Sequence, residues 1–384
     1  MGARCDDESM LGIRPRLHWA ARGTVAAVLG AAFVVLGAAP AGAHGPAGAQ
    51  PTNFSSRVRS VTPPIPGIRV EVRDLGSQLE VRNDTSYDVV ILGYSGEPYL
   101  RVGPDGVYEN RRSPSVFLNR AQTVTAPVPR SYDARADPAW HRVRGGRAVS
   151  WHDHRVHWMG TALPPAVHDS PGRRHLVSRW IVTLRYRDSD IAVRGELRWV
   201  PGPSAVPRLA LALLVAMLVI ALGLTRHWGA VIFVSLGALA VLVTFLIAGD
   251  LSATSAGPWS ALLANAYSVL GVGVALGALG ALLRSRREPA DATPLVLVAA
   301  VILAVGGGLA NVTFLLRSQL PTTLPAPLAR TFVAVVLGGS IGVLVTAARK
   351  LRRPALLTVP PMPSERAPSQ AVSPAAAPPS DLHA

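Results

Sequence analysis

Residues 229–249 read GAVIFVSLGALAVLVTFLIAG, a run of 21 residues that carries no charged side chain. An α-helix rises about 1.5 Å per residue, so a helix of this length crosses the roughly 30 Å hydrocarbon core of a bilayer. One run of similar length and composition precedes it and three more follow it, and together the five runs predict a bundle of five transmembrane helices. The predicted spans are 207–225, 229–249, 259–283, 294–316 and 331–348.

The composition of the whole chain agrees with a membrane protein. Of its 384 residues, 49% are hydrophobic and only 16% are charged. The formal net charge is +15, and arginine supplies almost all of it because Lys350 is the only lysine. We attribute this charge to membrane topology and anionic lipid, and we expect no nucleic-acid partner. The single cysteine, Cys5, excludes an intramolecular disulfide bond and a cysteine-based metal centre.

The beginning of the chain has the three parts of a secretory signal peptide. Arginines precede an apolar stretch at residues 24–39, and Ala41-Gly42-Ala43 then offers a cleavage site of small residues. We therefore predict a signal peptide at 1–43 and an extracytoplasmic domain at 44–205. An uncleaved anchor helix is the alternative interpretation of the same residues.

The charges at the ends of the predicted spans indicate the same orientation. Basic residues are concentrated at the ends that would lie together on one side of the bilayer, and the positive-inside rule makes that side the cytoplasm. The eight residues are Arg226, Arg284, Arg286, Arg287, Arg349, Lys350, Arg352 and Arg353. We thus expect a multi-pass protein of the cell membrane, surrounded by the lipid bilayer, with its transmembrane bundle at 206–348. The Pro/Ala-rich tail at 349–384 is expected to be disordered in the cytoplasm.

Residues 51–205 have the alternating apolar and polar pattern of half-buried β-strands, as in Ile68-Arg69-Val70-Glu71-Val72-Arg73. Turn residues at Gly103-Pro104-Asp105-Gly106 and at Asp188-Ser189-Asp190 predict two hairpins. The fold class is therefore predicted as an α+β multidomain membrane protein, in which an antiparallel, immunoglobulin-like β-sandwich precedes the five-helix bundle. The expected core positions include Val70, Leu79, Val81, Val90, Leu92, Leu184, Val193 and Leu197.

The segment WHDHRVHWM, residues 151–159, is the candidate metal-binding segment of the exported domain, with three histidines and an aspartate. On a strand, His152 and His154 would project from one face about 7 Å apart. Imidazoles with a neighbouring carboxylate suit Cu(II) or Zn(II), and an N-terminal histidine left by signal cleavage would add an amine and an imidazole. The predicted metal ligands are His152, His154, His157, Asp153 and His44. The alternative is structural, with the imidazoles packed between the tryptophans and hydrogen-bonded to a carboxylate.

Polar residues inside the predicted spans indicate contacts between helices. Asn265, Tyr267 and Ser268 lie on the third span, and Asn311 and Thr313 lie on the fourth. We expect them to form helix–helix hydrogen bonds, because no charged residue or histidine stands at mid-membrane. The spacings Gly273-x-x-x-Gly277 and Gly338-x-x-x-Gly342 would let helices approach closely. Asp250 ends the second span, where water reaches it.

Known catalytic patterns are absent. The sequence contains no HExxH, no GxxxxGK[ST] and no GxSxG, so no enzyme activity is predicted. Two functions compete instead. The first is a cell-envelope membrane protein whose exported β-domain contacts a partner protein or an envelope component. The second is an extracytoplasmic protein that binds or handles copper or zinc.

Three segments carry a resemblance to a known group of proteins. Pro51–Ser56, Gly96–Asn110 (GEPYLRVGPDGVYEN) and Trp151–Met159 resemble segments of a family of uncharacterised actinobacterial multi-pass membrane proteins. This resemblance implies no activity. In architecture alone, the chain is similar to fusions of the periplasmic copper-binding protein CopC with the membrane protein CopD, in which an N-terminal histidine precedes a β-sandwich and a helical membrane domain. That similarity implies copper as the metal and His44 as a ligand, although the membrane-embedded histidines of those fusions are missing here.

Overall fold

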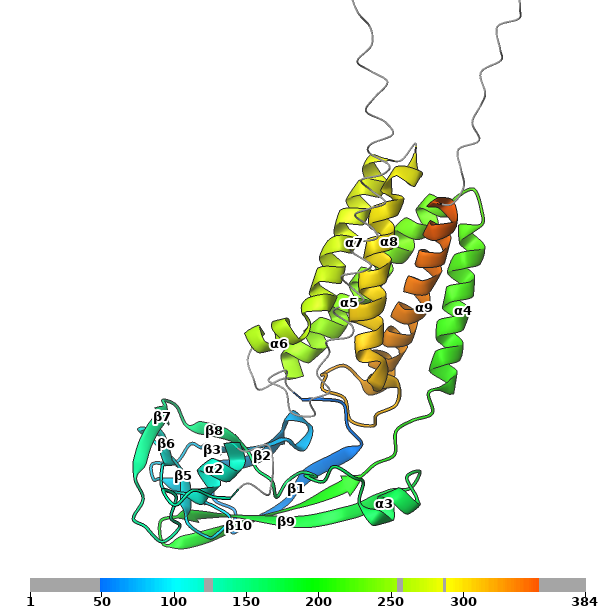
Figure 1. Ribbon diagram of the computed structural model, residues 1–384. Coiled ribbons are helices and arrows are strands. Elements are labelled where there is room, and N and C mark those ends of the chain that lie inside the picture. The colour runs from blue at the N-terminus through cyan, green and yellow to red at the C-terminus, as the bar shows by residue number, and fades with distance from the viewer. Residues whose placement is uncertain (1–48, 121–126, 254–257, 286–287, 352–384) are drawn as a thin grey trace, which may run out of the picture.

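The computed structural model describes residues 49–120, 127–253, 258–285 and 288–351. Within them, an antiparallel β-domain comes first and five long helices follow (Figure 1). The predicted signal peptide with His44, and the tail from residue 352 onward, lie outside the described residues.

The β-domain consists of two sheets whose strand pairs are all antiparallel. The larger sheet has the strand order β1-β10-β9-β4-β5-β6-β7, and the smaller one has the order β2-β3-β8. The strands are β1 (Phe54–Thr62), β2 (Ile68–Arg73), β3 (Gln78–Asn83), β4 (Val89–Leu92), β5 (Pro98–Gly103), β6 (Gly106–Asn110), β7 (Trp140–Arg144), β8 (Ala148–His152), β9 (His175–Tyr186) and β10 (Ser189–Trp199). Two short helices, α2 (Pro114–Arg120) and α3 (Pro165–Asp169), and a single turn, η1 (Asp74–Gly76), complete the domain.

Apolar and polar side chains alternate along the strands, and the inward-facing apolar residues of both sheets form one shared core. On β9, Trp180, Val182 and Leu184 are buried while the residues between them face outward. Leu79 and Val81 from the smaller sheet belong to the same apolar cluster. The predicted antiparallel β-sandwich is confirmed.

One predicted core position is wrong. Val90 is only partly buried, whereas Val89 and Ile91 on either side are fully buried. Side chains alternate along a strand, so choosing the wrong register by one residue exchanges the two faces. Val70 packs against the core as predicted, but it is only partly buried because β2 is an edge strand of the smaller sheet.

Both predicted hairpins are present, but the turn of the second is displaced. Strands β5 and β6 pair with Gly103 opposite Gly106, as the Pro-Asp-Gly sequence predicts. In the second hairpin, Ser189 already pairs with Tyr186, which leaves Arg187 and Asp188 as the turn. Arg187 adopts a left-handed φ of 55°.

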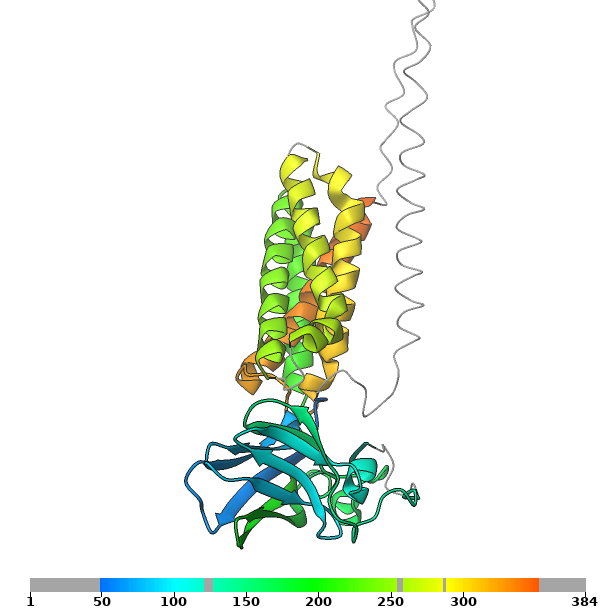
Figure 2. The ribbon, with the colours of Figure 1, turned by 90° about the vertical axis from the view of Figure 1, so that its left-hand side faces the viewer.

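The helical part contains five helical segments long and apolar enough to cross a membrane, among the residues described. The chain is therefore a multi-pass membrane protein. These segments lie side by side along one bundle (Figure 2). They are α4 (Val206–Gly223), α5 (Trp228–Ala253), α7 (Ala266–Arg284), a composite helix over Pro289–Leu315, and α9 (Ala326–Leu351).

Two of the predicted spans are not continuous α-helices. The third breaks at Asn265, which separates the short α6 (Pro258–Ala264) from α7. The fourth begins as η2 (Pro289–Ala292) and α8 (Thr293–Ile302), widens into a π-helix, η3 (Leu303–Gly308), and ends as a 3₁₀-helix, η4 (Leu309–Leu315). Both irregular segments lie toward the β-domain end of the bundle (Figure 1).

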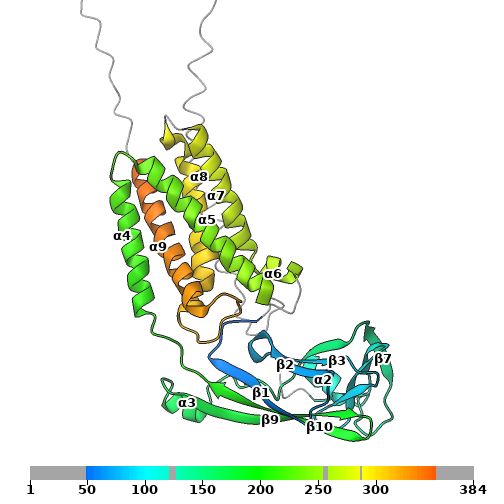
Figure 3. The same cartoon turned by 180° about the vertical axis from the view of Figure 1, so that it is seen from behind.

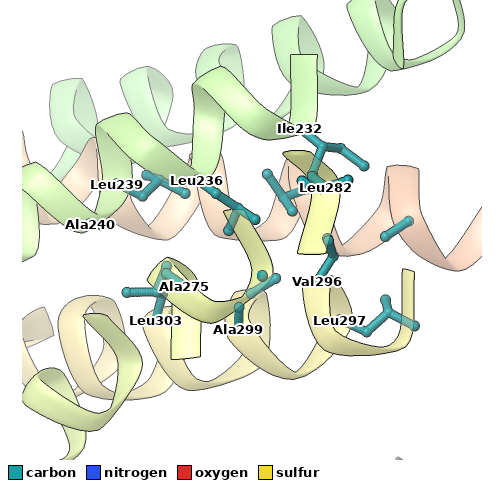
Figure 4. Close-up of a cluster of buried hydrophobic side chains, with 14 of the residues drawn as sticks. Ile232, Leu236, Leu239, Ala240, Ala275, Leu282, Val296, Leu297, Ala299 and Leu303 are labelled. Atoms are coloured by element: carbon teal, nitrogen blue, oxygen red, sulfur yellow. The ribbon is translucent and has the colours of Figure 1, made fainter. Parts of the chain in front are cut away.

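The bundle interior pairs large side chains with small ones. Figure 4 shows Leu236 of α5 on the side of the helix that faces α7, and Leu239 lies against α9, where a Cβ on Gly339 would be 2.8 Å from its Cδ2 atom. Ala275 of α7 and Ala299 of α8, both fully buried, belong to the same apolar cluster. Small residues on one helix leave room for leucine on the next.

Close approach of α4 and α9 depends on glycine. A Cβ atom on Gly338 would lie 2.0 Å from the Ala212 carbonyl oxygen of α4, and one on Gly342 would lie 2.6 Å from Cβ of Val219. The other predicted motif behaves differently, because a Cβ on Gly273 would meet nothing within 4 Å. A Cβ on Gly277 would reach only ordinary van der Waals distance, 3.9 Å from Leu295 Cδ2 of α8, so of the two spacings Gly338-x-x-x-Gly342 is the one that requires glycine.

The β-domain is hydrogen-bonded to the bundle. Thr52 pairs with Gln319 through two backbone hydrogen bonds of 3.1 and 2.9 Å, and Asn53 Oδ1 accepts a hydrogen bond of 2.8 Å from the Ser318 amide. The segment before β1 and the loop before α9 thus meet at one place, seen from behind in Figure 3. We call residues 52–53 and 318–319 the joint.

The substitution Gly338→Ala should destabilise the bundle by about 1–3 kcal/mol, because the added methyl group clashes with the backbone of α4. Gly273→Ala is the matched control and should be neutral or slightly stabilising, since alanine favours helix. Apparent melting temperatures of the purified chain in detergent measure both. Equal melting temperatures for the two variants would contradict the assigned contact.

Candidate functional site

The three histidines of the predicted metal site come together, although they do not lie on one strand. Strand β8 ends at His152, and the chain then turns, so His154 and His157 belong to the following loop. The ring centroids are 4.4 Å apart for His152 and His157, 5.1 Å for His152 and His154, and 6.0 Å for His154 and His157. A hydrogen bond of 2.9 Å links His152 Nδ1 to the Ser77 carbonyl oxygen. We call these three side chains the imidazole cluster.

Asp153, predicted as a metal ligand, is a structural ion-pair partner. Its side chain is fully buried, and the Arg155 guanidinium donates to Oδ1 at 2.9 Å and to Oδ2 at 2.7 Å. Trp151 Nε1 donates to Oδ2 at 2.9 Å. Burial alone would raise the pKa of Asp153, but these hydrogen bonds outweigh it, and the pKa lies below its usual value. The role of Asp153 as a metal ligand stays a prediction, and a metal ion there would have to compete with this arginine for the carboxylate.

Tyr94 holds the loop that carries the imidazole cluster. The hydroxyl of Tyr94 accepts a hydrogen bond of 2.9 Å from the His154 amide, and the Arg155 guanidinium lies 4.8 Å from the centre of its ring. Burial raises the pKa of Tyr94, so the phenol stays neutral. The ion pair and this phenol together hold the turn that gathers the histidines.

The cluster is not a preformed metal site. In the described part of the chain, no three His, Cys, Asp or Glu side chains are arranged to hold one metal ion. The remaining predicted ligand, His44, lies outside the described residues. The gathered imidazoles are nevertheless the part of the sequence prediction that the fold supports.

A second candidate is a cavity that no pattern in the sequence predicts. It has a volume of about 370 Å³ and lies between the β-domain and the near end of the bundle. The turn η1 contributes Asp74 and Leu75, and the bundle contributes residues from α5, α6, α7, η3 and η4. We call it the interdomain cavity.

The polar residues predicted to join helices line this cavity. Ser268 Oγ donates to the Gly306 carbonyl oxygen at 2.8 Å, and Asn311 Nδ2 donates to that of Gly307 at 3.1 Å. Asn265 Nδ2 lies 3.4 Å from Asp250 Oδ2. The expectation of helix–helix hydrogen bonds is confirmed for Ser268, and Asn265 approaches Asp250 of α5, whereas Asn311 bonds within its own span.

A third candidate is the outer face of the larger sheet. Residues paired directly across strands share a face, so Arg57, Glu196 and Arg179 lie side by side on β1, β10 and β9. Six exposed arginines share this surface with two carboxylates, Glu196 and Asp190. We call it the arginine face, made of Arg57, Arg59, Arg179, Arg185, Arg194 and Arg198.

The chain has no match among protein-family models, curated proteins or solved structures. The three candidates therefore rest on their own geometry.

Asp153→Asn should destabilise the β-domain even in chelator, because it leaves the buried Arg155 charge without its partner. We expect a loss of about 3 kcal/mol, or roughly 6–12 °C in apparent melting temperature. Because the pKa of Asp153 is lowered on folding, its stabilisation is complete above the unfolded pKa of about 3.9 and is lost as the pH falls further. Thermal unfolding of both proteins between neutral and acidic pH measures this.

Asp169→Asn serves as the control, since Asp169 is largely exposed. A destabilisation by Asp153→Asn that appears only when copper or zinc is present would restore the metal-ligand assignment.

Proposed function

We propose that this protein is a multi-pass membrane protein of the cell envelope whose extracytoplasmic β-domain binds an anionic envelope polymer through the arginine face. The observation that carries the proposal is the excess of six exposed arginines over two carboxylates on the outer face of strands β1, β9 and β10. Binding, rather than catalysis, is the activity that this surface suits.

The position of the arginine face favours a partner away from the membrane. Strands β9 and β10 lie on the side of the β-domain remote from the helices (Figures 1 and 3). Their inner side chains fill the core, so the arginines point away from the bundle. A lipid surface on the bundle side is therefore a poor partner for them.

An extracytoplasmic β-domain follows from the charge distribution along the bundle. Arg226, Arg284, Arg349 and Lys350 flank the helix ends remote from the β-domain. The positive-inside rule then supports a cytoplasmic location for those ends and an extracytoplasmic one for the β-domain. The signal peptide proposed for residues 1–43 supports the same orientation.

The spacing of the arginines suits a repeating anion. Neighbouring strands lie about 4.8 Å apart, and alternate residues on one strand lie about 6.8 Å apart. Arg194 and Arg198 are four residues apart on β10, about 13.6 Å by this spacing, and Arg57 on β1 pairs with Glu196 between them. The three positive charges thus lie at intervals that span several phosphate or carboxylate groups of a polymer. Glu196 engages Arg59 and Arg198, so it neutralises only part of this positive charge.

Replacing Arg57, Arg194 and Arg198 by glutamine should weaken binding of labelled long-chain polyphosphate to the full-length protein in detergent. Each exposed ionic contact contributes about 0.5 kcal/mol. Removing three of them should therefore weaken binding by about tenfold. Binding should also fall as salt rises, and less steeply in the variant.

A matched triple variant, with Arg69, Arg82 and Arg130 replaced by glutamine, removes the same charge from other surfaces. Equal loss in both variants would show that net charge alone attracts the polymer and would contradict the arginine face. Right-side-out vesicles should bind the polymer and inverted vesicles should not, which tests the orientation separately.

The second candidate function is binding of Cu(II) or Zn(II) by the imidazole cluster. The observation that favours it is the approach of three imidazole rings to within 4.4–6.0 Å of one another. Neutral imidazoles are good ligands for both metals. Small rotations of the side chains would turn the packed rings so that their nitrogen atoms converge on one ion.

Chelator-washed protein should bind close to one equivalent of Cu(II) or Zn(II), and the affinity should fall below about pH 6.5, where protons compete for imidazole. The double variant His152→Ala/His154→Ala should abolish this binding, whereas His168→Ala, in the exposed helix α3, should not. Wild-type affinity weaker than about 10 μM would leave the cluster with a packing role only.

A further inference from the structure

The interdomain cavity is lined by one carboxylate that the fold does not neutralise. Asp250 stands near the end of α5, and its Oδ1 atom is buried without a hydrogen bond from any described group. Its Oδ2 atom has one contact, the 3.4 Å approach of Asn265 Nδ2, which is long for a hydrogen bond. A buried carboxylate normally receives several donors, because removing it from water is costly.

The other charges of the cavity do not compensate Asp250. Arg73 and Asp74 line the opposite, β-domain side. Arg73 is engaged by Glu71 and Glu80 on the outer surface of the smaller sheet. The lining charges therefore leave the bundle side of the cavity negative.

The broken helices give the cavity its polar wall. Asn265 stands at the break between α6 and α7, and Gly306 lies in the π-helix η3. A Cβ on Gly306 would lie 2.7 Å from the Tyr267 carbonyl carbon, so glycine permits the close contact between η3 and α7. The carbonyl oxygen of Gly306 and the amide of Asn311 reach the same space as Asp250. Irregular helices inside a membrane bundle occur where backbone groups line a cavity.

The cavity wall is mixed, and its carboxylates are too few and too separated for a bare metal ion. Phe314, Leu320 and Ala261 form an apolar part of the wall beside the polar groups. Calcium and similar ions need six or more oxygen ligands, whereas the two carboxylates here, Asp250 and Asp74, stand on opposite sides. A volume of about 370 Å³ instead suits a small organic molecule.

From these observations we propose that the interdomain cavity binds a small organic ammonium compound, with its N–H groups donating to Asp250 and its carbon chain lying against Phe314 and Leu320. The ammonium group supplies both the positive charge and the donors that Asp250 lacks within the protein. The ligand contacts η1 as well as the bundle, so binding would stabilise the contact between the β-domain and the bundle. This site is separate from the arginine face and does not depend on the function proposed for it.

The test uses the full chain in nanodiscs made only of phosphatidylglycerol, with ethanolamine as the probe and ethylene glycol as its uncharged counterpart. Ethanolamine should raise the apparent melting temperature, and ethylene glycol should not. Choline, which has the charge but no N–H donor, should bind at least about tenfold more weakly than ethanolamine, as measured by equilibrium dialysis.

Two variants separate the site from a general effect of amines. Asp250→Asn keeps the shape of the side chain and should weaken ethanolamine binding at least about tenfold. Ala264→Phe leaves Asp250 in place but fills the cavity from the end of α6, and it should abolish binding. Should either variant bind ethanolamine as the wild type does, the proposal is overturned.

A second arm distinguishes a free amine from a lipid headgroup. Nanodiscs that contain phosphatidylethanolamine should stabilise the wild type, but not Asp250→Asn, if the headgroup enters the cavity. Stabilisation that requires Asp250, in either arm, supports the ammonium site. The arm that responds shows whether the ammonium group comes from a free amine or from a lipid headgroup. Absence of an Asp250-dependent effect in both arms refutes the site.

Discussion

The joint between residues 52–53 and 318–319 determines how the two halves of this protein are related. Without it, the chain that follows β10 would be a simple tether from the sandwich to α4. The joint is reinforced from the bundle side by Arg330, which is buried and donates to the carbonyl oxygens of Phe314 and Arg317 at 3.0 and 2.7 Å. Phe314 belongs to the irregular end of the fourth span, and Arg317 lies in the loop that follows it. One arginine thus holds the loop on which the β-domain rests.

The same place explains why two spans lose regular helical structure. Inside a bilayer, each backbone N–H and C=O group needs a partner within the protein, so a break in a helix persists only where other groups satisfy it. Ser268 and Asn311 provide donors for the carbonyl groups freed in η3. The interdomain cavity lies where these irregular segments face the β-domain, and residues of α6, η3 and η4 line it. The cavity is polar because the side chains that hydrogen-bond to the freed carbonyl groups also line it.

The imidazole cluster and its arginine partner show how local order creates a site-like arrangement. The ion pair of Asp153 with Arg155 fixes the turn directly after β8, and the turn brings His154 and His157 back to His152. Spacing on a continuous strand would have placed His152 and His154 about 7 Å apart along one face. The turn instead brings the rings into contact, at centroid distances of 5.1 Å or less from His152. The carboxylate that the sequence assigned to metal binding is the one that builds the turn.

The sequence by itself determined the membrane spans, the antiparallel sandwich and most of its core, because hydrophobic length and alternation are local properties that packing must respect. It also singled out the three histidines whose rings the fold brings together, although it placed His152 and His154 on one strand. Only the tertiary structure decided that Asp153 serves Arg155, that Gly338 and not Gly273 lies at a helix contact, and that Asp250 faces a cavity. Each of these depends on which distant segment lies opposite, and the joint between residues 53 and 318 spans 265 positions of the chain. Such pairings are set by the packing of the whole molecule, which no local pattern of residues records.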